Sequence, residues 1–131
     1  MKARADIKFC ITNSTKTKLP SLDFRSIKER VLGKNYDLSL NIVGTKKIKE
    51  LNKKYRNIDE PTDILSFPLD KKTGEIYINP EWTNKKAKKF GRDFPNFFAF
   101  LFIHGLVHLI GYDHSSKMES IEKDIREEFC I

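Results

Sequence analysis

All three histidines of this 131-residue chain fall within one run of eleven residues, H-G-L-V-H-L-I-G-Y-D-H. His104 and His108 are four residues apart in a stretch expected to be helical, so their side chains project from one face with Cβ atoms about 5 to 6 Å apart. Gly111 suits the left-handed conformation that ends a helix, after which the chain can bring His114 back over the same place. The spacing predicts that His104, His108 and His114 bind one metal ion.

The ligand type indicates which metal is bound and for what purpose. Three neutral imidazoles are a usual set for catalytic zinc, with water in the fourth position, whereas closed structural sites more often use cysteine thiolates. The nearest cysteine, Cys130, lies sixteen residues after His114. We therefore predict one zinc ion per chain in an open site, although imidazole also accepts nickel, copper and iron. The alternative, three hydrogen-bonded core histidines, is disfavoured because burying unpaired imidazoles is costly.

The ligand spacing H-x-x-x-H-x-x-G-x-x-H is also that of the metzincin proteases. Those enzymes carry a glutamate general base directly after the first histidine, where this chain has Gly105. A metalloprotease-like hydrolase therefore remains an alternative for which no base is assigned. A bound metal would still acidify water or polarise an oxyanion without that glutamate.

The surrounding patterns predict an α+β fold that would hold the histidine helix in its core. Alternating apolar residues predict four strands, over residues 5–11, 38–42, 64–69 and 74–79. Apolar residues three and four apart predict helices that begin after Ser21 and after Gly44, and others over 81–90, over about 95–110 and at the C-terminus. We expect a single domain over 1–131: a small mixed sheet of about four strands packed on helices, with a central metal-binding helix.

Composition limits the class of protein and its partners. Hydrophobic residues at 39% and charged residues at 33% fit a folded globular chain, and the net charge of +7 makes nucleic acid a candidate partner. Ordinary solubility of a lysine-rich surface is the alternative. The apolar stretch 97–110 is too short for a bilayer, so no membrane partner is expected. Cys10 and Cys130 form no disulfide or metal pattern, and the N-terminus lacks an export signal, which favours the cytoplasm.

A second segment, N-K-K-Y-R-N-I-D-E-P-T-D-I-L-S-F-P over 52–68, adds a family resemblance. Together with the histidine run it closely resembles the YbeY endoribonuclease family, bacterial factors of ribosomal RNA maturation. The resemblance implies an α+β fold, zinc at His104, His108 and His114, and metal-dependent cleavage of single-stranded RNA in 16S ribosomal RNA 3′-end maturation and ribosome quality control. It implies RNA as the partner, with the ribosomal subunit or ribosomal proteins as further candidates.

The resemblance also implies that Arg56 matters for activity. A guanidinium has a planar donor fork suited to two phosphate oxygens, and the alternative is a surface ion pair with Asp59 or Glu60. Two departures from the family pattern concern the acid after Gly74, which is Glu75 in place of the usual aspartate, and a shorter link from His114 to the last helix. They put in doubt a role for that acid near the metal, but not the three histidines.

Further residues have open assignments. Ser66 is expected to pair locally in preference to binding phosphate. Trp82 and Phe90 are expected to pack in the core in preference to stacking on bases. Asp113 is either a turn residue or a partner of a ligand imidazole. A non-catalytic zinc-containing ribosome-assembly factor remains the second alternative function. The basic residues that could line an RNA path are Lys46, Lys47, Lys49, Lys53, Lys54 and Arg56, and Lys85, Lys86, Lys88, Lys89 and Arg92.

Overall fold

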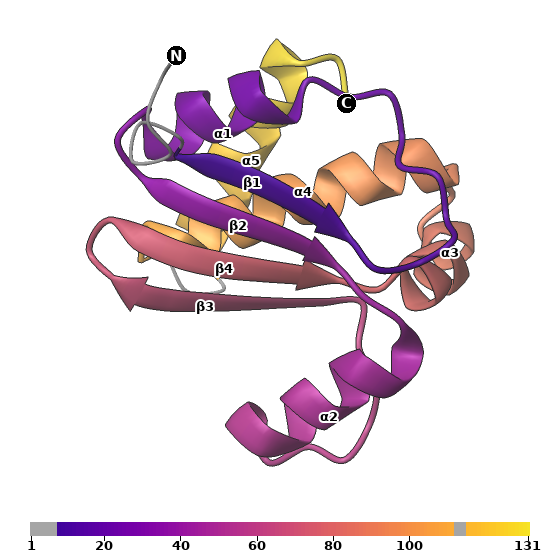
Figure 1. The fold of residues 1–131 in the computed structure, drawn as a ribbon. Coiled ribbons are helices and arrows are strands. Elements are labelled where there is room, and N and C mark those ends of the chain that lie inside the picture. Colours follow the sequence, from indigo (N-terminus) through magenta and orange to yellow (C-terminus); the bar gives the residue numbers. More distant parts are fainter. Residues whose placement is uncertain (1–7, 112–114) are drawn as a thin grey trace.

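The computed structural model describes residues 8–111 and 115–131. Figure 1 shows the elements in chain order within these residues. They are β1 (Phe9–Asn13), α1 (Phe24–Leu32), β2 (Asp37–Ile42), α2 (Thr45–Arg56), β3 (Ile64–Asp70), β4 (Thr73–Ile78), α3 (Pro80–Lys89), α4 (Phe94–Leu109) and α5 (Ser116–Glu128).

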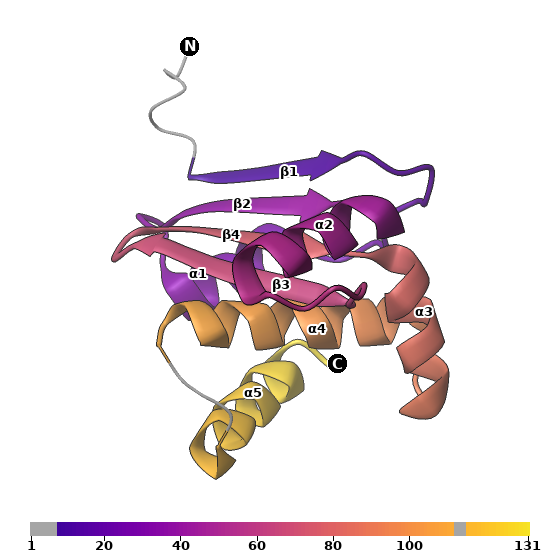
Figure 2. The same ribbon diagram turned by 90° about the horizontal axis from the view of Figure 1, so that it is seen from below.

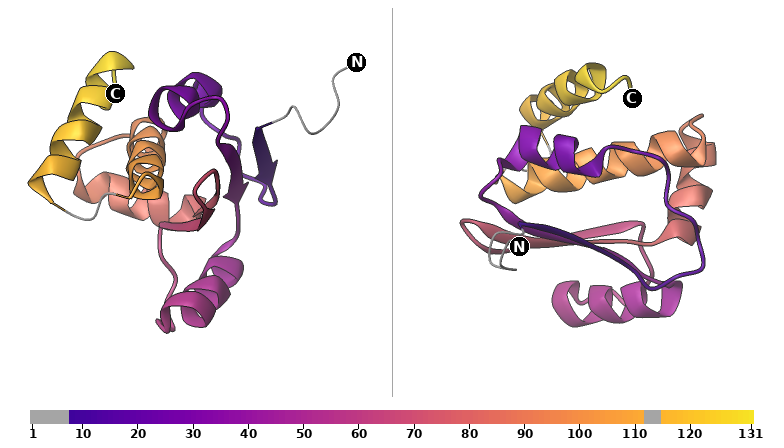
Figure 3. Two further views of the ribbon diagram at one scale, coloured as in Figure 1. Left: turned by 90° about the vertical axis from the view of Figure 1, so that its left-hand side faces the viewer. Right: turned by 45° about the horizontal axis from the view of Figure 1, so that its top comes forward.

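The strands form a mixed sheet in the order β1-β2-β4-β3. β1 pairs with β2 and β2 pairs with β4 in parallel, whereas β3 pairs with β4 as an antiparallel hairpin. The helices α1, α4 and α5 lie on one side of the sheet and α2 lies on the other, with α3 at one end (Figures 2 and 3). The predicted α+β class and mixed four-stranded sheet are therefore confirmed.

The helix α4 is the centre of the main core. Ten of its sixteen residues are buried, and it packs against β3, β4 and the helices α1, α3 and α5. The buried alternate residues of β2 and β4, such as Leu40 and Ile76, belong to the same core cluster as Phe102 and Leu106 of α4. Burying these side chains contributes about 1.5 to 3 kcal/mol for each large residue. The histidine helix is thus held by apolar contacts on most of its circumference.

Two element boundaries differ from the sequence prediction for local reasons. The first helix is capped by Asp23 and not by Ser21, because an Asp23 oxygen accepts the Ser26 backbone N–H at 3.0 Å. The first strand is β1 and continues to Asn13, past the predicted end at residue 11; of the predicted strand, residues 5–7 lie outside the described part. Ile11 is 38% exposed because β1 is an edge strand, so its predicted burial is wrong.

Gly105 determines how α4 faces the sheet. A Cβ atom at this position would lie 2.9 Å from Ile64 Cδ1, 2.9 Å from Ser66 Oγ and 3.1 Å from Ile76 Cδ1. These distances are shorter than carbon side chains tolerate without displacement. The helix therefore lies so close to β3 and β4 that any other residue at this position would displace these side-chain ends.

We expect Gly105→Ala to lower the free energy of unfolding by about 1 kcal/mol. Overpacking typically costs about 1 to 3 kcal/mol, and alanine returns up to about 1 kcal/mol of helix propensity. Gly44→Ala is the matched control, because a Cβ at Gly44 meets no atom within 4 Å, and its effect should stay below about 1 kcal/mol. Urea unfolding measures the stability of both variants. An unchanged or higher midpoint for Gly105→Ala would show that the neighbouring side chains of β3 and β4 shift to accept the methyl group.

Candidate active site

A cavity of about 520 Å³ opens between α4, α3, β3 and the C-terminal end of α2. Its polar wall comes from four separate parts of the chain, and aromatic rings from α4 and the end of α3 cover another part. The polar side chains used below are Arg56, Asp63, Ser66, Lys86, His104 and His108. We call this space the histidine cavity. Residues of both segments that the sequence singled out line it, namely Arg56 and residues 62–66 from one and His104 and His108 from the other.

The histidines reach the cavity because α4 is less buried at every fourth residue. Asn96, Phe100, His104 and His108 are half-buried, while the α4 residues between them from Phe97 onward are buried. The rings of His104 and His108 lie 4.7 Å apart between centroids, at 89° to each other. The prediction that the side chains of His104 and His108 project from one face of the helix and lie close together is therefore confirmed.

A buried glutamate of α5 holds His104. Glu122 Oε1 lies 2.7 Å from His104 Nδ1, and the two side chains are 6% and 21% exposed. Because an ionised carboxylate only accepts hydrogen bonds, this contact places a proton on Nδ1. A carboxylate behind an imidazole is the arrangement that orients histidines in many metal sites. Sequence patterns did not indicate Glu122, since it lies eighteen residues from its partner.

The third predicted ligand, His114, and the neighbouring Asp113 lie outside the described residues. Within the described ranges, no group of three histidine, cysteine, aspartate or glutamate side chains is placed to hold a metal ion. The described donors nevertheless fit a zinc site, since two imidazoles meet at one cavity wall and a carboxylate holds one of them. The metal itself stays a prediction.

Arg56 ends α2 and reaches the histidine cavity. Asn57 follows in the left-handed conformation at φ 58°, which closes the helix, and its backbone N–H donates to Lys53 O at 3.1 Å. The ion pairs predicted as an alternative for Arg56 are absent among the described residues. Asp59 lies instead 3.9 Å from Lys49 and 3.8 Å from Lys53. Arg56 therefore lines the cavity without an ion pair to that loop.

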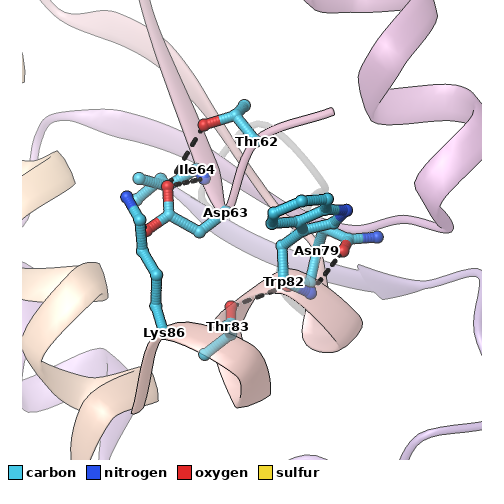
Figure 4. Close-up of polar contacts among 7 residues, drawn as sticks. All are labelled: Thr62, Asp63, Ile64, Asn79, Trp82, Thr83 and Lys86. Atoms are coloured by element: carbon cyan, nitrogen blue, oxygen red, sulfur yellow. Dashed lines mark hydrogen bonds and ion pairs between the residues drawn. The ribbon is translucent and has the colours of Figure 1, made fainter. Parts of the chain in front are cut away.

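Asp63 fixes the cavity wall where β3 begins (Figure 4). Its Oδ1 accepts the Ile64 backbone N–H at 2.8 Å and the Thr62 hydroxyl at 3.2 Å, and its Oδ2 lies 3.2 Å from Lys86 Nζ. The Asp63 side chain is 6% exposed and that of Lys86 is 47% exposed. The backbone carbonyl of Asp63 also accepts the N–H of Asn79 at 2.8 Å. One aspartate thus joins β3, α3 and the end of β4.

The start of α3 is anchored by Asn79 beside this aspartate. The Asn79 side chain caps the helix by accepting the Trp82 N–H at 2.8 Å, and its backbone carbonyl accepts the Thr83 hydroxyl at 2.7 Å (Figure 4). Lys85 lies over the Trp82 ring at 4.7 Å, and Trp82 does not line the histidine cavity. Phe90, at the other end of α3, is 59% exposed and does line it. The expectation that Phe90 is a core residue is therefore wrong.

The acid after Gly74 lies on the other face of the sheet. Gly74 and Ile76 pack toward α4, so Glu75 and Tyr77 point toward α2, where Tyr77 donates to Glu75 Oε2 at 3.0 Å. Burial, followed by the bond to Glu75, raises the pKa of Tyr77 to about 12. Neither side chain takes part in chemistry at the histidines.

Of the basic residues proposed to line an RNA path, Arg56 and Lys86 line the histidine cavity. The lysines of α2 are exposed, and Lys85 pairs with Glu81 at 3.4 Å. Ser66 Oγ donates to the Gly105 carbonyl oxygen of α4 at 3.4 Å, so Ser66 has a hydrogen-bond partner within the protein, but that partner is not the local one that was predicted. Within the described ranges, no helix has both the length and the apolar character needed to cross a membrane.

Comparisons with known proteins agree with this geometry. The family model described as Endoribonuclease YbeY matches residues 9–129. The chain belongs to the Endoribonuclease YbeY family. It is 40% identical to the Endoribonuclease YbeY of Aliarcobacter butzleri (strain RM4018) over 92% of this chain and 88% of that protein. It is 37% identical to that of Pelagibacter ubique (strain HTCC1062) over 93% and 88%.

A solved structure supports the same assignment. The solution structure of the Thermotoga maritima protein TM1509 superposes with a TM-score of 0.64 at 32% identity, covering 92% of this chain and 88% of that one. The YbeY resemblance stated from the residues is therefore confirmed, and membership supports a nuclease that cleaves RNA internally. The individual roles of Arg56 and the histidines stay predictions.

In this YbeY family member we expect Asp63→Ala to lower the free energy of unfolding by about 2 to 3 kcal/mol, because the buried Ile64 N–H loses its acceptor. Asp63→Asn keeps an acceptor oxygen and loses only the charge facing half-exposed Lys86, so it should cost about 1 kcal/mol. Chemical denaturation of both variants checks the order. Equal losses would show that the ion pair, and not the hydrogen bonds, holds the start of β3.

Proposed function

We propose that this protein is a zinc-dependent, single-strand-specific endoribonuclease that acts in the cytoplasm in 16S ribosomal RNA 3′-end maturation and ribosome quality control. Its partners would be ribosomal RNA and, beyond it, the ribosomal subunit or ribosomal proteins. The observation that carries the proposal is that His104, His108 and Arg56, from both segments of the family resemblance, line one cavity. Family membership supports the nuclease activity.

The size and lining of the cavity favour a single strand. A volume of about 520 Å³ is that of a small-molecule pocket, which admits a nucleotide and not a duplex. Half-buried Phe100 and the exposed ring of Phe90 offer apolar and stacking surface, the usual means of holding unpaired bases. Cleavage of a base-paired strand would first require the target nucleotide to leave the helix.

In the proposed site His104, His108 and His114 hold one zinc ion. When bound, zinc acidifies a water molecule and polarises a phosphoryl oxygen. Glu122 keeps the proton of His104 on Nδ1, so that the lone pair of the neutral ring is on Nε2. Glu122 is therefore a positioning residue for a ligand and not a ligand itself.

Two cations of the cavity wall act on the substrate. Arg56 presents a planar donor fork to the phosphate and stabilises the negative charge that develops during cleavage. Lys86 is held at the wall by Asp63 and contributes a second positive charge. Because Asp63 is buried and already accepts hydrogen bonds, it repels an incoming phosphate less than an exposed carboxylate would.

The structure bears on the two alternative functions differently. In a metalloprotease the general base follows the first histidine, but a side chain at Gly105 would run into Ile64, Ser66 and Ile76, so no base can reach the cavity from there. A non-catalytic assembly factor would use the same histidines only to hold the fold. A cleavage assay combined with metal analysis distinguishes the proposal from that alternative.

We expect about one zinc per purified chain and cleavage of single-stranded RNA by the wild type at low salt. Arg56→Gln should keep zinc and lower kcat/KM by about 100-fold, because a donor to developing charge is lost. Lys54→Gln, which removes an exposed charge on the same helix, is the control and should lower it only slightly. His114→Ala should lose zinc and activity together.

The contrary outcomes distinguish the alternatives. Zinc without cleavage would favour the assembly factor, and a His114→Ala variant that no longer folds would indicate a structural metal. Cleavage of casein without cleavage of RNA would favour the protease. Absence of stoichiometric metal would contradict the zinc site.

We expect Glu122→Gln to weaken zinc binding by roughly 10-fold, since loss of a carboxylate behind a ligand histidine typically costs about 10- to 100-fold in affinity. Competition with a chromophoric chelator measures this without any activity assay. Glu119→Gln, one turn earlier on α5 and exposed, is the control and should bind zinc as the wild type does. Equal affinities in all three proteins would show that Glu122 only fills space behind His104.

A further inference from the structure

Two arginines from distant parts of the chain meet at one aromatic ring. Arg92, between α3 and α4, and Arg126 of α5 each place the guanidinium carbon 4.7 Å from the centre of the Phe100 ring. Arg92 also donates to Asn96 Oδ1, one turn earlier on α4. Both arginines are half-buried. Two like charges therefore share one aromatic ring and are partly removed from bulk water.

The pair has no counterion in the part of the chain that the structure describes. Neither guanidinium forms an ion pair there; the nearby carboxylate Glu122 is bound to His104. Burial lowers the pKa of Arg126, and Arg92 lowers it further, against the weaker opposing effects of Glu122 and Glu127. The contacts with Phe100 offset part of this repulsion. An anion bound to the Arg126 guanidinium would offset more.

The arginine pair lies beside the proposed active site. A second cavity, of about 430 Å³, shares Phe90, Phe100 and His104 with the histidine cavity. Its charged lining consists of Arg126 and Lys123 together with Glu119 and Glu122, whereas Arg92 lies on the Phe100 ring outside both linings. Phe100 and His104 are neighbours on the half-buried stripe of α4, about 6 Å apart along the helix axis.

We propose that Arg126, held on the Phe100 ring that it shares with Arg92, binds a backbone phosphate of the RNA strand next to the phosphate that is cleaved. This inference rests on the proposed function. The strand would enter across Phe90, whose exposed ring borders both cavities and offers a face for a base. The subsite would set which bond reaches the histidines, because a strand fixed at one phosphate presents its neighbour at a defined distance.

The alternative is that the arginines stabilise the fold through Phe100 alone. The two hypotheses predict opposite effects on stability. If the charges only stack on the ring, removing one lowers the melting temperature. If they await an anion, removing one relieves repulsion and leaves the melting temperature of the RNA-free protein unchanged or higher.

The experiment compares steady-state cleavage of single-stranded RNA by the wild type, Arg126→Gln and Arg25→Gln. Arg25 is the control, since its side chain is 61% exposed on α1 and its removal changes the net charge equally. We expect Arg126→Gln to raise KM about fivefold to tenfold with kcat unchanged, and to reduce the slope of log KM against log salt by about 0.7, the value for one phosphate of a single strand. Arg25→Gln should change neither.

Each other outcome overturns the subsite. If the wild type cleaves RNA and Arg126→Gln behaves like Arg25→Gln, the subsite is wrong and the proposed function stands. If the melting temperature falls while KM is unchanged, the arginines are structural. If inorganic phosphate at constant ionic strength stabilises the wild type but not Arg126→Gln, and both variants bind RNA alike, the site takes a free anion. If the wild type neither binds nor cleaves RNA, the proposed function fails first and the subsite with it.

Discussion

The close contact between α4 and the sheet at Gly105 is the constraint on which the site depends. Successive residues of a helix are about 100° apart around its axis, so once Gly105 faces β3 and β4, His104 and His108 point about 100° and 60° to one side of that direction. The directions of the two histidine side chains around the helix axis therefore differ by only about 40°. The missing side chain at Gly105 is what brings both rings to the edge of the sheet, where the histidine cavity opens, instead of into the core or into solvent.

The segment 52–68 acts as one structural unit that carries Arg56 to that edge. α2 lies on the opposite face of the sheet from α4, and the chain returns from its end to β3, the edge strand beside the cavity. Along this return the Asn52 side chain donates to the Glu60 carbonyl at 2.8 Å, and Asp63 fixes the start of β3. Arg56 thus reaches around the edge of the sheet because of hydrogen bonds at both ends of the loop that follows it.

Local patterns in the sequence were sufficient for the elements and for part of the site. The strand hairpin, the apolar helix and its end at Gly111, which has φ +99°, follow from short-range periodicity and turn chemistry. The same local reasoning predicted Ser21 as the N-cap of α1, whereas Asp23, two residues later, forms the cap hydrogen bond. It could not find the hydrogen bond of Glu122 with His104, or the contact of Arg126 with Phe100, because tertiary packing of α5 on α4 creates both. The family itself was recognisable only because two separated segments matched together.

The distribution of charge around the two cavities explains how one small domain can present positive charge to a strand while burying several acids. Asp63 accepts hydrogen bonds from the start of β3 and pairs with Lys86, and Glu122 is hydrogen-bonded to His104, so each of these carboxylates is already engaged within the protein. Arg56 at one end and Arg92 with Arg126 at the other have no such partner among the described residues. A phosphate chain laid along the α4 stripe would therefore meet uncompensated cations on both sides of the histidines. The protein's own acids act as supports for the wall and for the ligand histidine, which leaves the attraction for the strand to the arginines.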